Sequence, residues 1–166
     1  MKEGEIFEIL YDTREPRPNW LIKHQKKLNI IVHRQYLDVG DFSITGFESE
    51  FMIERKTTAD LVSSFIGEKK LLEGITTNRR EQFRKMWERA TQRVKILYVV
   101  GKVGDLIQGN FFSKMEVNPI LASLVKWQQR YHYDWYWVDD EAQGQIFVYW
   151  HCREFLALKE EEKKNG

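Results

Sequence analysis

The order of apolar and polar positions along the chain predicts strands that alternate with helices. Short apolar runs that suit buried strands lie at residues 6–11, 30–37, 42–45, 51–56, 94–100 and 134–138. Helical spacing of apolar residues predicts helices at 20–28, 60–65 and 78–90, a helix from Pro119 and a last helix after Asp140. Because strands and helices alternate in this way, we expect an α/β sandwich around a mixed sheet.

Three of the predicted helices carry clear apolar stripes. The stripes are Phe83, Met86, Trp87 and Ala90; then Ile120, Leu124, Trp127 and Tyr131; and finally Val148, Cys152 and Phe155. Asn118 is expected to cap the helix that has Pro119 in its first turn. Residues 67–74 are expected to form an exposed loop, and Phe111 and Phe112 fit either the core or a contact surface.

Length and composition favour a single domain. The chain has 166 residues, of which 42% are apolar, and this is enough for one sizeable core. We expect one domain over residues 1–158 and a charged, flexible tail over 159–166.

Charge and cysteine usage exclude several classes of protein. The formal net charge is +1, so any attraction to nucleic acid must come from local basic patches. Cys152 is the only cysteine, which excludes a disulfide framework and a cysteine-based zinc site. No run reaches membrane length and no signal peptide is visible, so we expect an intracellular protein of the cytoplasm or nucleoid.

The stretch Glu54-Arg55-Lys56 directly follows a predicted buried strand. Side chains alternate along a strand, so Glu54 and Lys56 point to one face and Arg55 to the other. Gly40 permits a tight turn before the strand at 42–45, and Gly46 turns the chain back after it. The resulting hairpin can bring Asp41 near Glu54. Two carboxylates and a lysine suit a metal-dependent phosphodiesterase. The alternative is a solvated Glu/Lys pair of no chemical importance.

Two other charged stretches are candidates for a site. Asp12, Arg14 and Glu15 follow the first predicted strand, where a polar turn is an equally good interpretation. The helix at 78–90 has a basic face, which suits either phosphate binding or solvent. That face carries Arg79, Arg80, Arg84, Lys85 and Arg89.

In motif order, these residues resemble the nuclease domain of XPF-type structure-specific endonucleases. The matching motifs are Asp12-x-Arg14-Glu15, Gly40-Asp41 and Glu54-Arg55-Lys56-x-x-x-Asp60. The resemblance runs from about Ile9 through Gly101. It implies the restriction-endonuclease-like fold, which is a three-layer α/β/α sandwich with a central mixed sheet.

The resemblance also implies Mg²⁺- or Mn²⁺-dependent cleavage of DNA near a flap, fork or junction. Asp41 and Glu54 would bind the metal with the backbone carbonyl of Arg55, and Lys56 would position the attacking water. Asp12 would support the metal or a second ion at the edge of the site. Further catalytic or DNA-binding positions would be Asp60, Arg14, Glu15, Arg55, Arg79, Arg80 and Gln82.

The chain departs from typical cellular relatives, which carry a tandem helix-hairpin-helix domain and often a helicase portion. It resembles a stand-alone nuclease domain, such as a phage or mobile element would encode. The family implies a homodimer, which we place at residues 131–137 and the last helix, where the aromatic residues suit a core equally well. A separate partner protein would then supply the grip on duplex DNA.

Two alternatives remain open at this point. One is a non-catalytic DNA-binding or scaffolding subunit that needs a partner. The other is a protein-interaction module that binds a host factor through its aromatic C-terminal half.

Overall fold

A computed structural model describes residues 5–66, 69–72, 75–107 and 117–166. The strands are β1 (Phe7–Tyr11), β2 (Ile30–Arg34), β3 (Phe42–Ile44), β4 (Phe51–Thr57), β5 (Lys69–Leu72), β6 (Ile75–Asn78), β7 (Val94–Val100) and β8 (Asp134–Val138). The helices are α1 (Asn19–Leu28), α2 (Thr58–Ile66), α3 (Arg79–Arg89), α4 (Val103–Ile107), α5 (Val117–Tyr131) and α6 (Glu141–Asn165).

The main sheet has the strand order β2-β1-β3-β4-β7-β8 and mixes both strand directions. The β2-β1, β4-β7 and β7-β8 pairs are parallel, whereas β3 runs antiparallel to both β1 and β4. The antiparallel β3 lies at the centre because the tight turns at Gly40 and Gly46, both with positive φ, reverse the chain on either side of it. The turn at Gly40 leads through Asp41 into β3, whose first residue, Phe42, pairs with Ile53 in β4.

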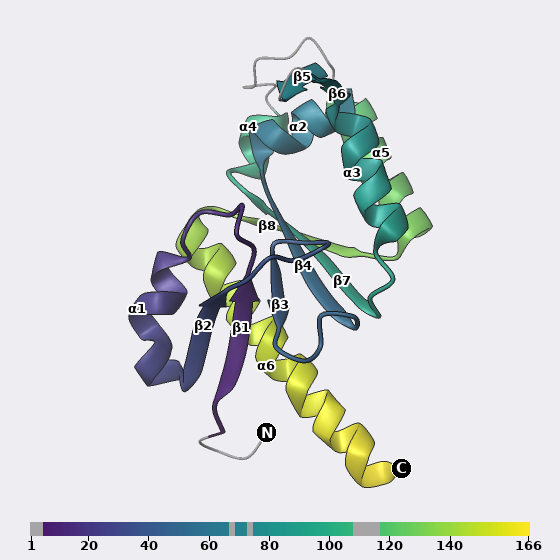
Figure 1. The fold of residues 1–166 in the computed structure, drawn as a ribbon. Helices are drawn as coiled ribbons and strands as arrows, with labels where there is room; N and C mark the ends of the chain where they lie inside the picture. Colours follow the sequence, from purple (N-terminus) through teal and green to yellow (C-terminus); the bar gives the residue numbers. More distant parts are fainter. Residues whose placement is uncertain (1–4, 67–68, 73–74, 108–116) are drawn as a thin grey trace.

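Helices cover both faces of this sheet (Figure 1). On one face α6 packs against β3, β7, β8 and α1. On the other face α2 packs against β4, β7, α3 and α5. The expected three-layer α/β/α sandwich with a mixed sheet is therefore confirmed.

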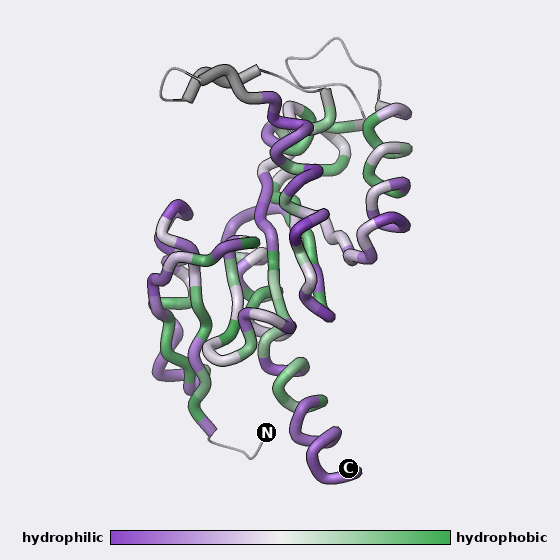
Figure 2. The backbone as a smooth tube through the Cα atoms, turned by 45° about the vertical axis from the view of Figure 1, so that its right-hand side comes forward, coloured by the Kyte–Doolittle hydropathy of each residue, from purple (hydrophilic) through white to green (hydrophobic). Residues whose placement is uncertain are grey.

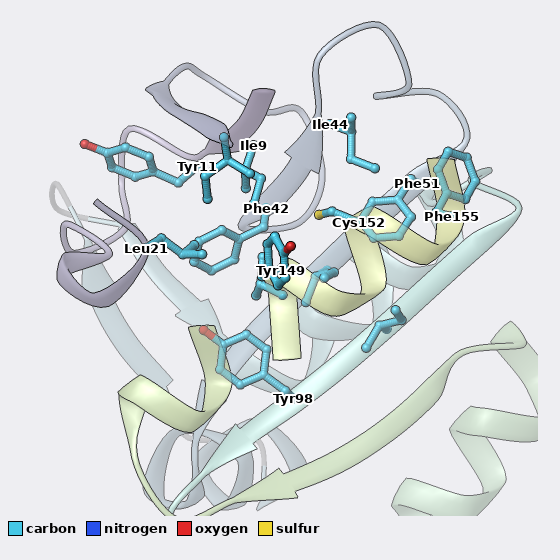
Figure 3. Packing of buried hydrophobic residues seen from close by; sticks show 14 of the residues in the cluster. Ile9, Tyr11, Leu21, Phe42, Ile44, Phe51, Tyr98, Tyr149, Cys152 and Phe155 are labelled. Atoms are coloured by element: carbon cyan, nitrogen blue, oxygen red, sulfur yellow. The ribbon is translucent and has the colours of Figure 1, made fainter. Parts of the chain in front are cut away.

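Each face of the sheet has its own apolar core, because side chains alternate along β4 and β7. Phe51, Ile53 and Tyr98 join the core beneath α1 and α6, together with Cys152 (Figure 3). Met52 and its neighbours on the opposite face join the core beneath α2, α3 and α5. The apolar stretches of the central strands β4 and β7 are therefore buried on both sides of the sheet.

Most predicted elements are confirmed, and β7 and β8 have the predicted bounds. The three apolar stripes are buried as expected, except that Met86 is only partly buried. The strand predicted for 30–37 is shorter, because β2 ends at Arg34 and the chain then turns toward the site. The helix α5 begins at Val117, so Asn118 lies within its first turn rather than before it.

The secondary structure differs from two of the sequence-based expectations. The predicted loop at 67–74 contains β5, which forms a two-stranded antiparallel ribbon with β6; residues 67–68 and 73–74 lie outside the described part of the chain. Backbone hydrogen bonds hold such a ribbon together, so its charged sequence does not exclude it. Residues 159–165 continue α6 instead of forming a separate tail, and Figure 2 shows these last turns as strongly hydrophilic.

Phe111 and Phe112 lie outside the described residues, so the choice between core and contact surface stays open. Within the part of the chain that the structure describes, none of the helices combines the length and hydrophobicity needed to cross a membrane.

Candidate active site

The β3-β4 hairpin places Asp41 beside Glu54, as the sequence predicts. Phe42 pairs with Ile53 in the register, and the backbone N–H of Asp41 donates to the carbonyl of Ile53 at 2.8 Å. The backbone N–H of Arg55 donates to Asp41 Oδ2 at 2.7 Å. These bonds join the turn to the middle of β4, and both acidic side chains line one cleft.

Lys56 completes the group on that same face. Its Nζ donates to Glu54 Oε1 at 2.8 Å and lies 5.1 Å from the ring centre of Phe83 on α3. Glu54 is almost fully buried, with 5% of its surface exposed. A buried carboxylate needs a compensating charge, and the lysine provides it.

The surroundings of Asp41 disfavour the negative charge of its carboxylate. Burial, then the negative charges of Glu54 and Glu15, raise the pKa of Asp41 well above its usual range. Burial by itself would lower the pKa of Lys56, but the adjacent Glu54 and Asp41 outweigh it, and the net shift is upward. Lys56 is therefore a cation at neutral pH. A positively charged ligand beside Asp41 would stabilise the ionised form of that carboxyl group.

These three side chains line a cleft of about 650 Å³ between the sheet and α3. The α3 wall contributes basic, polar and apolar side chains: Arg79, Gln82, Phe83, Lys85, Met86 and Arg89. Arg14, Glu15 and Asp38 lie on the opposite side, and Arg89 reaches across to Asp38 at 2.6 Å. A cleft with carboxylates on its floor and cations on its rim suits a phosphate chain.

Asp60 lies in the first turn of α2 and belongs to the same cleft. Its backbone N–H donates to Thr57 Oγ1 at 3.1 Å, and its Oδ2 accepts from the same hydroxyl at 2.9 Å, so the pair caps α2. Its Oδ1 accepts from Arg79 at 3.1 Å. Asp60 thus ties α2 to α3 and orients one arginine of the cleft wall.

Asp12 is fully buried and does not line the cleft. Its Oδ1 accepts from the backbone N–H of Arg14 at 2.8 Å and from Arg14 Nε at 2.5 Å, while Oδ2 accepts from the N–H of Leu37 at 2.7 Å. Burial raises its pKa, but these bonds outweigh burial and the net shift is downward. The structure thus gives Asp12 a role in holding the loop and Arg14.

Arg55 points to the opposite face of the sheet, as strand alternation predicts. Its guanidinium forms a bidentate pair with Glu141, the first residue of α6, and lies 3.6 Å from Glu15 Oε2. No motif in the sequence indicated a role for Glu141. Its only signal was its place after Asp139 and Asp140 at the start of a predicted helix.

The other predicted DNA contacts separate into two groups. Arg14 has 60% of its side chain exposed, and with Arg79 and Gln82 it lines the cleft. Arg80 lies outside the cleft, donates to the carbonyl of Phe65 at 3.3 Å and stacks on Trp127. Phe83, which the sequence analysis assigned only to the core, also lines the cleft beside Lys56.

The residues present fit a divalent cation of the hard, oxygen-binding kind. Asp41 and Glu54 repel each other in a buried site, and a cation between them would relieve that repulsion. Among the described residues, no group of three or more His, Cys, Asp and Glu side chains could hold a metal ion. Water and the carbonyl of Arg55 would have to complete the coordination, which suits Mg²⁺ because it retains several waters.

Comparison with known proteins shows the family and the fold. Two solved structures of XPF from Aeropyrum pernix, one of them in complex with DNA, share the fold, with TM-scores of 0.64 and 0.65 and 16% sequence identity. They cover 88% and 92% of this chain, which spans 60% and 66% of theirs. Curated protein sequences gave no match. The family match covers residues 11–149, and the chain therefore belongs to the ERCC4 domain family.

Proposed function

We propose that this protein is a metal-dependent endonuclease that hydrolyses a phosphodiester bond near a branch in DNA. The observation that carries the proposal is the group of Asp41, Glu54 and Lys56 on the floor of a cleft with a basic wall. Membership of the ERCC4 domain family and the likeness to a DNA-bound XPF support it.

Each side chain of the group has a distinct task in this proposal. Asp41 and Glu54 hold Mg²⁺ or Mn²⁺, with the carbonyl of Arg55 nearby. When bound, such an ion makes water a better nucleophile and stabilises negative charge on a phosphate. Lys56 orients the attacking water and neutralises charge that develops at the phosphate. Asp12 organises the loop that carries Arg14 rather than binding the ion itself.

Affinity for DNA comes from the basic side chains around the cleft. Arg14 on one side and Arg79 and Lys85 on the other are placed to contact phosphates. Such contacts carry no sequence information, so a preference for branched DNA would come from the shape and deformability of the junction. We expect nicked products with a 5′-phosphate and a 3′-hydroxyl.

We also propose that the active form is a homodimer formed through the C-terminal half. Tyr131 and Tyr133 are buried in the core and cannot be contact residues. The outer edge of β8 has no strand partner among the described residues, and Trp150 on α6 is 49% exposed. A strand edge and an exposed aromatic residue suit such an interface. A partner protein that grips duplex DNA remains part of this proposal.

The test is cleavage of labelled flap, fork, four-way junction and plain duplex DNA with Mg²⁺, with Mn²⁺ or with a chelator. The variant Asp41→Ala, Glu54→Ala is the inactive control, and light scattering reports the oligomeric state. Metal-dependent cutting of branched DNA that the double variant lacks supports the proposal. Tight DNA binding without cutting under any condition would instead support the scaffolding subunit.

A further inference from the structure

The side chain of Arg55 connects the active site to the far side of the sheet. Only 17% of it is exposed, and Arg55 Nε donates to both carboxylate oxygens of Glu141 at 3.0 and 3.1 Å. A terminal guanidinium nitrogen makes a further bond to Glu141 Oε1. Bidentate pairing of this kind restricts both the position and the rotation of the guanidinium.

The backbone of Arg55 is part of the active site. Its N–H holds Asp41 Oδ2 at 2.7 Å, and its neighbours on either side are Glu54 and Lys56. A rotation of β4 at Arg55 would therefore move both catalytic side chains and break the bond to Asp41. Contacts that hold the Arg55 side chain in place therefore also hold Asp41, Glu54 and Lys56 in their relative positions.

Close contacts fix the position of the first turns of α6, where Glu141 lies. Asp140 caps the helix by accepting from the N–H of Gln143 at 2.8 Å. A Cβ on Gly144 would lie 2.5 Å from the ring of Tyr98, so the helix lies directly on β7. Tyr98 pairs with Arg55 in the sheet register and lies in the core shown in Figure 3.

The same turns also hold the loop that carries Glu15. Gln145 Oε1 accepts from the backbone N–H groups of Trp20 and Leu21 at 2.8 and 3.2 Å, at the start of α1. That loop places Glu15 Oε2 within 3.6 Å of Arg55. The first turns of α6 therefore contact β4, β7 and the start of α1, and these contacts hold the three segments in place relative to one another.

We propose that Glu141 is a positioning residue for the active site, acting through Arg55. It holds the Arg55 side chain on the far face of the sheet, and with it the β4 backbone that binds Asp41 and carries Glu54 and Lys56. This inference rests on the metal site of the proposed function, because positioning has meaning only if the carboxylates of Asp41 and Glu54 bind a metal ion.

The experiment compares the full-length wild type with Glu141→Ala and Glu141→Gln. The matched control is Glu154→Ala, which removes an exposed glutamate farther along the same helix. We measure kcat and KM on a branched DNA substrate, Mn²⁺ affinity by calorimetry without DNA, and the folded fraction by circular dichroism. Glu141→Gln keeps one acceptor for the arginine, so its effect should be smaller than that of Glu141→Ala.

We expect Glu141→Ala to lower kcat about tenfold or more, since misplaced catalytic groups are costly, while KM for DNA stays within about twofold. Mn²⁺ affinity of the folded protein should fall as well, and Glu154→Ala should change neither. An unchanged kcat and Mn²⁺ affinity would overturn the inference. So would a loss of kcat that matches the loss of folded protein, or a rise in KM alone.

Failure of the proposed endonuclease function would give different results from failure of the Glu141 inference. If the wild type binds Mn²⁺ but cuts no DNA, the endonuclease proposal fails and the calorimetry still decides the role of Glu141. If the wild type neither binds Mn²⁺ nor cuts DNA, both proposals are overturned together.

Discussion

Asp41 lies in a site that disfavours its negative charge in the metal-free protein. Its carboxyl has a raised pKa in the folded state, caused first by burial and then by Glu54 and Glu15. A raised pKa means that ionised Asp41 destabilises the fold at every pH above that value. The penalty disappears as the pH falls below the unfolded pKa of about 3.9, because the carboxyl is then protonated in both states.

Asp41→Asn should therefore raise the free energy of unfolding of the metal-free protein at pH 7.5, because asparagine places no negative charge in this buried site. Asparagine keeps an acceptor for the N–H of Arg55, so the turn is preserved. Thermal unfolding in chelator at pH 7.5 and at pH 4 measures the effect, which should shrink at the lower pH. Asp139→Asn, at an exposed position, serves as the control. A destabilised Asp41→Asn protein at pH 7.5 would contradict this account.

Lys56 offers a residue-scale test that separates binding from chemistry. Lys56→Met removes a cation that lies 2.8 Å from Glu54, so repulsion of a bound metal ion should decrease. We expect Mn²⁺ affinity to stay equal or rise, while the cleavage rate falls by about 10²-fold or more. Calorimetry and single-turnover cleavage measure the two quantities. Parallel loss of both would mean that Lys56 mainly supports the fold.

At the scale of elements, α3 depends on its cap at Asn78. The side chain of Asn78 accepts from the N–H groups of Arg80 and Glu81 at 3.0 and 3.2 Å. Asn78→Ala leaves these groups without that partner and should lower the free energy of unfolding by about 1 kcal/mol. Urea denaturation measures the change, and Asn78→Asp should restore most of it. An equal loss in both variants would show that the cap is not the cause.

The seat of α6 on β7 depends on Gly144. In Gly144→Ala the new Cβ would lie 2.5 Å from the buried ring of Tyr98, so the helix must shift. We expect destabilisation of about 1–3 kcal/mol, as for overpacked cores, together with slower cleavage because Glu141 moves with the helix. Gly104→Ala on α4 is the control, since no atom of the described residues lies within 4 Å of its added Cβ. Equal stability of the two variants would refute the close contact.

At the scale of the whole molecule, attraction to DNA must be local, because the net charge is only +1. DNA affinity should fall linearly on a log–log plot against salt, with a slope near −0.9 for each phosphate contacted. Arg79→Ala should reduce the steepness of that slope by about 0.9. Lys27→Ala, an exposed position on α1 away from the cleft, should leave it unchanged. Fluorescence anisotropy at several salt concentrations measures both slopes.

The sequence by itself determined the layers and much of the site. The apolar run of β7 and the aromatic run of β8 predicted both strands with their observed bounds. Strand alternation was enough to place Glu54 and Lys56 on one face and Arg55 on the other. The direction of successive side chains is set by the backbone of each strand or helix alone, so the sequence shows which residues share a face.

Only the tertiary structure decided which distant side chains meet. It placed Asp12 among buried donors outside the cleft, Phe83 beside Lys56, and Glu141 on Arg55 across 86 positions of sequence. It also showed the β5-β6 ribbon, which lacks a strong apolar pattern. Such contacts depend on strand order and helix seating, and no local period of the sequence encodes either of them.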